Sequence, residues 1–175
     1  TFLDCSRNNT FDYTDIRNAE TAVKLRSGIS GSPDLEILSS KLMHNSVGSL
    51  DAEGSYIFAV NSVFAHSGFS TVRLSGSSSC ILIHCTVENH WDYDFRTAPA
   101  FYIGKNGGSL PVVTIKNSII AGSMKNEMSV DAGDEEVLTK IYADSSFITI
   151  ATISSGWWNH HAFTTVQVKG DPLFI

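Results

Sequence analysis

Apolar and polar positions alternate in short segments that recur every two to three dozen residues along the chain. The clearest copies are residues 113–120 and residues 57–64, where two alternating apolar positions lead to an asparagine and a second apolar pair follows. Strict alternation predicts a strand with one buried face. Strand-like segments that recur at this period predict a solenoid, in which each repeat packs only on its neighbours.

The small residue in the middle of each copy marks a predicted bend, and we call it the anchor. The anchors are assigned to Asp15, Ser39, Asn61, Cys85, Asn117 and Ser145. The alternating apolar residues before each anchor are expected to face the core, such as Ile81 and Ile83 before Cys85. Before Asp15 the same pattern assigns Phe11 and Tyr13 to the core. Asparagines at the bends of successive coils are expected to stack into an amide ladder.

Each repeat holds three short strands and three bends, which describes one turn of a parallel β-helix. The pattern therefore predicts an all-β solenoid of about six to seven coils, a single β-helix domain over residues 1–175 that is incomplete at both ends. An antiparallel sandwich is the alternative, because it also has short strands at regular spacing. The sandwich is disfavoured because residues 106–107 form the only Asn-Gly hairpin signal.

Composition excludes some classes of partner. The formal net charge is −6 and charged residues make up 17% of the chain, so neither nucleic acid nor an anionic membrane surface is an expected partner. No apolar run approaches the ~20 residues that span a bilayer. If their strand is unbroken, Cys80 and Cys85 are expected to point to opposite faces of it, which disfavours a disulfide between them. Together with Cys5 they are interpreted as small buried residues, and their redox state is left open.

Residues 61–63 (Asn-Ser-Val), 117–122 (Asn-Ser-Ile-Ile-Ala-Gly) and 170–174 (Gly-Asp-Pro-Leu-Phe) carry a family resemblance. They look like segments of the right-handed parallel β-helix repeat proteins of bacteria, which include pectate-lyase-like domains and secreted or surface-anchored proteins of gut Bacteroidetes. The resemblance implies a right-handed single-stranded parallel β-helix in a secreted or cell-surface protein. Relatives continue past the last segment, which implies a fragment of a longer helix. Polysaccharide lyases, glycoside hydrolases and adhesins all belong to this family, so the resemblance gives little indication of an activity.

The longest insertion, residues 90–99, is the first candidate site, because solenoids often bind through loops on one edge. Residues 66–70 and 122–127 are expected on the same side. The candidate ligand-binding residues of the long loop are Trp91, Asp92, Tyr93, Asp94 and Arg96. Aromatic faces stack on sugar rings, Arg and carboxylates hydrogen-bond hydroxyls, and Asp92 with Asp94 are candidate Ca²⁺ ligands. The structural alternative is that the aromatic side chains only pin the loop onto the helix.

Two further candidates are Trp158 and a column of histidines. An exposed Trp158 is suited to stacking on a carbohydrate, and packing against neighbouring protein is its alternative role. Five residues past three consecutive anchors stand His44, His66 and His90, about 4.8 Å apart if the coils stack in register. This column is a candidate metal site, and a ladder of outward polar side chains is the structural alternative.

Three functions are compatible with these features. The favoured one is a secreted or cell-surface module, without catalytic residues or a required cofactor, that binds a polysaccharide or a protein partner through one flank. The alternative is a polysaccharide lyase or glycoside hydrolase acting on acidic polysaccharide, with Arg96 or Lys105 as the base. Asp92 and Asp94 would then serve as Ca²⁺ ligands or as an acid–base pair. The third is a passive spacer, and in each case the open coil ends are expected to be covered by flanking coils or by self-association.

The row of outward side chains next to the anchors argues against the enzyme. This row is expected to contain Glu36, Phe58, Leu82, His84, Thr114 and Lys116. Glycoside hydrolysis uses a pair of carboxylates, and Ca²⁺-assisted chemistry needs several oxygen ligands. A row with so few acidic residues therefore favours a binding surface over a catalytic one.

Overall fold

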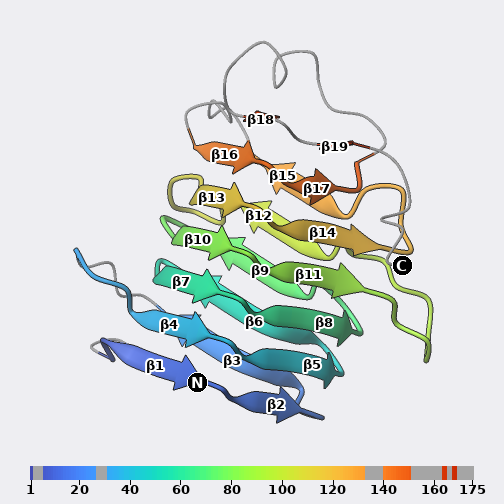
Figure 1. Ribbon diagram of the computed structural model, residues 1–175, viewed down its shortest axis with the longest axis horizontal. Helices are drawn as coiled ribbons and strands as arrows, with labels where there is room; N and C mark the ends of the chain where they lie inside the picture. The colour runs from blue at the N-terminus through green and yellow to red at the C-terminus, as the bar shows by residue number, and fades with distance from the viewer. Residues whose placement is uncertain (2–5, 27–30, 133–139, 151–162, 165–166, 169–175) are drawn as a thin grey trace.

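The strands of this protein stack as successive coils of a parallel β-helix. A computed structural model describes residues 1, 6–26, 31–132, 140–150, 163–164 and 167–168. All regular elements in these residues are strands, and strands that neighbour one another in the three sheets pair in parallel (Figure 1). The predicted parallel β-helix, of about six coils, is confirmed, and the antiparallel sandwich is wrong.

The first five coils each contribute one strand to each of three sheets, and the described residues of the later coils add strands to the first two sheets. The first sheet contains β1 (Asn9–Asp12), β4 (Leu35–Leu38), β7 (Tyr56–Val60), β10 (Ser79–Ile83), β13 (Val112–Lys116), β16 (Ile141–Asp144) and β18 (Phe163–Thr164). The second contains β2 (Asp15–Arg17), β5 (Lys41–Asn45), β8 (Val63–Ser67), β11 (Thr86–Asn89), β14 (Ile119–Gly122), β17 (Phe147–Ile148) and β19 (Gln167–Val168). The third contains β3 (Thr21–Arg26), β6 (Gly48–Glu53), β9 (Val72–Ser75), β12 (Phe101–Gly104) and β15 (Met128–Asp131).

A residue with left-handed backbone follows each of the first six strands of the first sheet and turns the chain toward the second sheet. These residues are Tyr13, Ser39, Asn61, His84, Asn117 and Ser145, with φ between 47° and 53°. Four of the six predicted anchors are therefore confirmed. The assignments at Asp15 and Cys85 are wrong, since Tyr13 and His84 occupy the bends of those coils.

The assignment at Cys85 fails because residues 80–83 are apolar on both faces of the strand. In β10 the side chains of Cys80 and Leu82 face the core and are fully buried, while Ile81 and Ile83 are only half-buried. A pattern without polar positions does not show which alternate set is inside, and a slip of one residue exchanges the two faces.

An inward ladder of hydroxyl groups lies directly after the left-handed residues. The Ser40 backbone N–H donates to Ser62 Oγ (3.1 Å), and the Ser118 N–H donates to Ser146 Oγ (3.1 Å). Cys85 occupies the same position in its coil, where its own N–H donates to Ser118 Oγ (3.0 Å). The predicted asparagine ladder is wrong, because the coil that bends at His84 separates Asn61 from Asn117.

Both cysteines of the described region are buried and unpaired. The strand is broken between them by the bend at His84, so the condition for opposite faces is not met, and Cys80 and Cys85 both point inward. Burial raises the pKa of both thiols. Cys5 lies outside the described residues.

Serine substitutions distinguish the two cysteines. We expect Cys85→Ser to leave stability nearly unchanged, because serine fills this ladder position in adjacent coils and Cys85 Sγ already donates to the Ile83 carbonyl (3.4 Å). Cys80→Ser should cost about 1–3 kcal/mol, because its hydroxyl would be buried without a partner in the core. Thermal unfolding of the two variants checks this order, and a less stable Cys85→Ser variant would contradict the ladder.

Candidate functional site

Three turns between the second and third sheets lie on the same side of the helix, as predicted. They are residues 68–71, 90–100 and 123–127, which connect β8 to β9, β11 to β12 and β14 to β15 (Figure 1). The middle turn is the longest of the three, and we call it the long loop. It carries most of the residues that the sequence proposes as a binding site.

A buried ion pair fixes the base of the long loop. Arg96, whose side chain is 3% exposed, donates from both terminal nitrogens to Glu127, whose side chain is fully buried. Arg96 Nη1 also donates to the Ala98 carbonyl (3.0 Å). The backbone N–H groups of Ala100 and Met124 donate to Glu127 at 2.8 and 2.6 Å. Arg96 therefore holds the loop to the next turn, and its guanidinium is too buried to bind a sugar as the sequence suggested.

The tip of the long loop presents aromatic side chains to solvent. Tyr93 is 82% exposed and Phe95 is 97% exposed. The Trp91 and Tyr93 rings lie 5.0 Å apart at 59°, and Trp91 packs beside Gly68, where an added Cβ atom would lie 3.4 Å from Trp91 Cε2. Because Tyr93 and Phe95 are so exposed, they do not pack the loop onto the helix. The alternative that the aromatic side chains only pin the loop therefore does not hold for these two residues.

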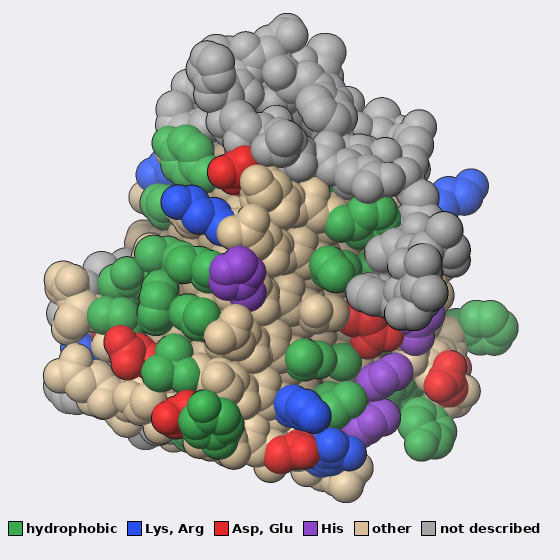
Figure 2. All heavy atoms as spheres, in the orientation of Figure 1, with side chains coloured by type: hydrophobic (Ala, Val, Ile, Leu, Met, Phe, Trp, Pro, Cys, Tyr) green, Lys and Arg blue, Asp and Glu red, His purple; other side chains and the backbone are tan. Residues whose placement is uncertain are grey.

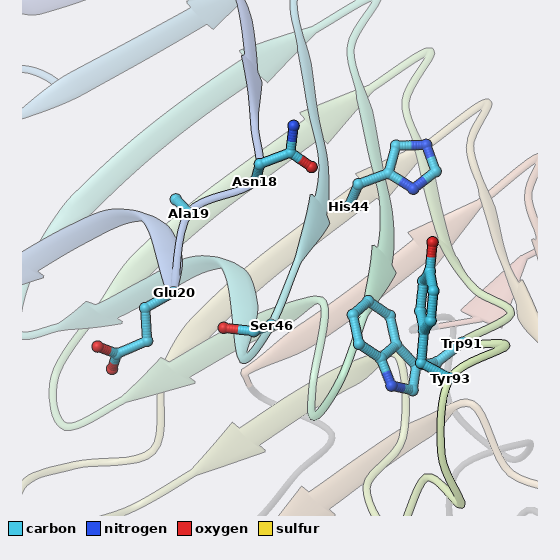
Figure 3. Close-up of a pocket in the computed structure, with 7 residues that line it drawn as sticks. All are labelled: Asn18, Ala19, Glu20, His44, Ser46, Trp91 and Tyr93. Atoms are coloured by element: carbon cyan, nitrogen blue, oxygen red, sulfur yellow. The ribbon is translucent and has the colours of Figure 1, made fainter.

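The loop tip and the first two coils enclose a groove of about 420 Å³ (Figure 3). Its lining residues are Asn18, Ala19, Glu20, His44, Ser46, Trp91 and Tyr93. Asn18 and His44 each have a left-handed backbone, with φ of 58° and 56°, at equivalent bends of adjacent coils. Figure 3 shows the Tyr93 hydroxyl directed toward His44. The groove places aromatic faces opposite several hydrogen-bonding side chains.

The three histidines do not share one position in their coils. His44 and His66 are equivalent, and their rings stack at 4.7 Å with 3° between the planes. Because the fourth coil bends at His84 rather than Cys85, the residue five positions on is the buried Asn89, and His90 falls one position later. The predicted three-histidine register is therefore wrong at His90.

A carboxylate links the histidines instead. Glu88 Oε1 lies 2.5 Å from His90 Nδ1, and its other oxygen lies 3.9 Å from His66 Nε2. His66 Nδ1 lies 2.9 Å from the His90 carbonyl oxygen. Figure 2 shows histidine side chains gathered at the right edge of this face, beside projecting hydrophobic side chains. Within the described ranges no group of three or more His, Cys, Asp or Glu side chains is arranged to hold a metal ion.

The remaining predicted residues are exposed or undescribed. Asp92 and Asp94 are exposed at the loop tip beside a shallow hollow that Trp91, Tyr93 and Phe95 also line. Asp94 Oδ1 accepts the Phe95 N–H (2.7 Å). Trp158 lies outside the described residues. The tip therefore combines two exposed acidic side chains with the aromatic cluster.

The outward row of the first sheet is poor in acids, as the sequence predicts, although two of its assigned members are wrong. The strand register places Thr10, Glu36, Phe58, Ile81, Thr114 and Tyr142 in one row. Leu82 is buried and His84 lies at the bend. Figure 2 shows hydrophobic side chains over this sheet, at the left of the view. Glu36 is the one carboxylate among these six residues, so they offer no carboxylate pair for glycoside hydrolysis.

Sequence reasoning missed several residues of the site. Asn18 and Ser46 line the groove, and counting five residues from the true bend at Tyr13 identifies Asn18. Nothing local in the sequence identifies Glu127 as the partner of Arg96, because the two residues are thirty-one positions apart. Such a pair becomes visible only when neighbouring coils are stacked.

Comparison with known proteins finds no match to this chain among protein-family models, curated proteins or solved structures. The fold therefore defines the class, an all-β parallel β-helix protein. In the part of the chain that the structure describes, no helix has the length and apolar character to cross a membrane.

Proposed function

We propose that this chain is a non-catalytic β-helix module of a secreted or cell-surface protein and that it binds glycans in the groove beneath the long loop. The observation that carries the proposal is the pair of aromatic rings, Trp91 and Tyr93, that line this groove together with polar side chains. Such amphipathic rings supply apolar contact area at low conformational cost. The secreted location and the pectate-lyase-like relationship rest on the sequence resemblance alone.

The polar wall of the groove suits a ligand rich in hydroxyl groups. Asn18 and Ser46 can each donate and accept hydrogen bonds, and Glu20 accepts them. His44 is stacked on His66, which limits its ring to one orientation. Binding pockets commonly combine apolar walls with a few placed polar groups of this kind. A sugar ring offers both an apolar face for the aromatic wall and hydroxyls for the polar wall.

The geometry weakens the enzymatic alternative. Arg96 is a candidate base of that alternative, yet its guanidinium is buried against Glu127. A general base must lie within hydrogen-bond reach of the proton that it removes. Asp92 and Asp94 are two positions apart on one exposed loop tip. The aromatic groove, in contrast, needs no proton transfer, so binding is the better-supported function.

Replacing Trp91 by alanine tests the proposal. Glycan-array screening of the purified chain should first identify a bound glycan, and Trp91→Ala should then weaken its affinity about tenfold or more in calorimetric titration, as loss of a central aromatic anchor does. Phe95→Ala is the matched control, because Phe95 is exposed on the same loop and does not line the groove. Its affinity should equal that of the parent.

Three results would contradict this proposal. Equal affinity of the Trp91→Ala variant would exclude the groove as the site. Unsaturated or shortened products on incubation with polysaccharide would favour the lyase or hydrolase alternative. Absence of binding to every glycan on the array would leave a protein partner or a spacer as the function.

A further inference from the structure

A second pocket lies on the outer side of the third sheet, at the other end of the long loop. Its volume is about 420 Å³, and its walls include Phe69, Ser70, Arg73, Thr97, Pro99 and Tyr102. It shares no lining residue with the groove beneath the loop tip. A ligand of this pocket would therefore bind independently of the proposed glycan.

Arg73 places a positive charge in this pocket without a carboxylate partner. It stands in β9 between Asp51 and Tyr102 of the adjacent coils, and no ion pair joins it to any residue that the structure describes. Asp51 is instead bound by Arg26 at 2.5 Å. The Arg73 guanidinium carbon lies 5.8 Å from the centroid of the Tyr102 ring. A cation–π contact of this kind uses none of the guanidinium N–H groups as hydrogen-bond donors to a carboxylate, so they remain available for a planar acceptor.

A buried hydroxyl without a partner lies in the same wall. Ser70 is 4% exposed, and its Oγ has no hydrogen-bond partner among the described residues. Buried polar groups in native proteins are nearly always satisfied, and rotation of the Ser70 side chain toward the pocket would let a ligand supply the missing partner. This observation is independent of Arg73.

The apolar walls are held in place by the loop base. Phe69, which is 47% exposed, precedes Ser70, and its carbonyl accepts a hydrogen bond from the buried Asn89 amide (2.7 Å). Pro99 stands between Ala98 and Ala100, whose backbone groups are bound by Arg96 and Glu127. Preorganised walls of this kind reduce the ordering cost of binding.

We propose that this pocket binds a small organic carboxylate with an apolar body. Arg73 pairs with the carboxylate, the Ser70 hydroxyl donates to one of its oxygens, and the Phe69, Pro99 and Tyr102 side chains cover the apolar part. In a chain of formal net charge −6, an unpaired cation inside a pocket makes this place selective for an anion. Two sources carry this chemistry, namely a free small acid and the C-terminal residue of a peptide.

Titration of the full chain with three probes tests the proposal. Phenylacetate and N-acetylphenylalanine carry the carboxylate, and N-acetylphenylalanine amide is the neutral analogue. Both acids should shift the backbone NMR signals of Ser70, Arg73 and Tyr102, whereas the amide should not. Tighter binding of N-acetylphenylalanine assigns the peptide terminus as the source, and tighter binding of phenylacetate assigns the free acid. Equal binding of the amide, or shifts confined to other residues, would overturn the proposal.

Two variants complete the test. Arg73→Gln should weaken binding of the better acid about tenfold or more, since charge-assisted hydrogen bonds of this size are lost. Arg17→Gln is the matched control, because Arg17 pairs with Asp15 on the exposed surface of the first coil, and its affinity should match the parent. Unchanged affinity of a folded Arg73→Gln variant would overturn the assignment. If that variant does not fold, the signal shifts of the parent chain decide the question alone.

Discussion

Replacing Glu127 by glutamine is expected to lower the free energy of unfolding by about 3–5 kcal/mol, the usual cost of removing one partner from a buried ion pair. Glu127 is fully buried and accepts hydrogen bonds from both terminal nitrogens of Arg96. Its oxygens also accept the backbone N–H groups of Ala100 and Met124. A glutamine would leave the Arg96 charge buried and would turn an amide donor toward these donors.

Thermal and urea unfolding of Glu127→Gln, of one control and of a double-mutant cycle with the single variants Arg96→Met and Glu127→Met measures this effect. Glu20→Gln is the control, because Glu20 forms an exposed pair with Lys24 (3.3 Å) that should add little stability. The double variant Arg96→Met with Glu127→Met removes both charges, and it should be more stable than the sum of the two single losses predicts. A Glu127→Gln variant that unfolds with the parent would show that the pair does not hold the loop.

The same pair links the two proposed sites. Arg96 and Glu127 fix the end of the long loop, whose tip lines the groove while residues 97–99 line the second pocket. A buried ion pair is weak evidence for stability, and Arg96 Nε has no hydrogen-bond partner among the described residues, but the four hydrogen bonds that Glu127 accepts can specify a single conformation of the loop. We therefore interpret Arg96 as a positioning residue for both surfaces. Loss of Glu127 should consequently reduce affinity at both sites, whereas Trp91→Ala should affect only the groove.

The period of the pattern was sufficient to predict the fold. Alternation at Leu35 and Ile37, and again at Val113 and Ile115, predicts strands with one buried face, and all four side chains are fully buried. A solenoid repeats this local rule in every coil, so few long-range facts are needed to predict the class. The repeat alone predicts that equivalent strands of successive coils stack in parallel, and no particular long-range contact has to be known.

Register and site were harder to predict, for two physical reasons. Where a strand is apolar on both faces, as in residues 80–83, the sequence does not show which alternate side chains face the core. The predicted bend therefore lies one residue too late. That slip assigned His90 to the column of His44 and His66, although the fifth residue past the true bend is the buried Asn89. The second reason is that Arg96 meets Glu127 only through the stacking of coils. The position of the long loop was predictable, but the division of its residues into a buried base and an exposed tip was not.

Replacing Gly68 by alanine is the second substitution for which we expect a large effect. A Cβ atom at this position would lie 2.1 Å from the Ser46 carbonyl oxygen and 3.1 Å from its carbonyl carbon. Both atoms belong to the backbone of the preceding coil, so no side-chain rotation can relieve the contact. The Gly68 N–H also donates to the Asn45 carbonyl (3.1 Å), which ties the two backbones together. We expect a loss of about 1–3 kcal/mol or more, as for other overpacked sites.

Gly31→Ala is the matched control, because an added Cβ atom there meets nothing within 4 Å. Surface substitutions of this kind usually change stability by less than about 0.5 kcal/mol. Both substitutions restrict the unfolded chain to the same extent. A difference between the unfolding midpoints of the two alanine variants therefore measures the steric contact between coils rather than the general effect of removing a glycine. Equal midpoints would contradict the close approach of Gly68 to Ser46.

The Gly68 substitution also connects stacking to binding. The added Cβ atom would lie 3.4 Å from Trp91 Cε2, and Ser46 lines the groove opposite that ring. A coil that moves to accommodate alanine must therefore change the distance between Ser46 and Trp91. We expect Gly68→Ala to weaken glycan binding at temperatures where it remains folded, while binding of carboxylates near Arg73 changes less. A variant that loses stability but keeps its glycan affinity would show that the groove tolerates this displacement, and that Trp91 alone determines recognition.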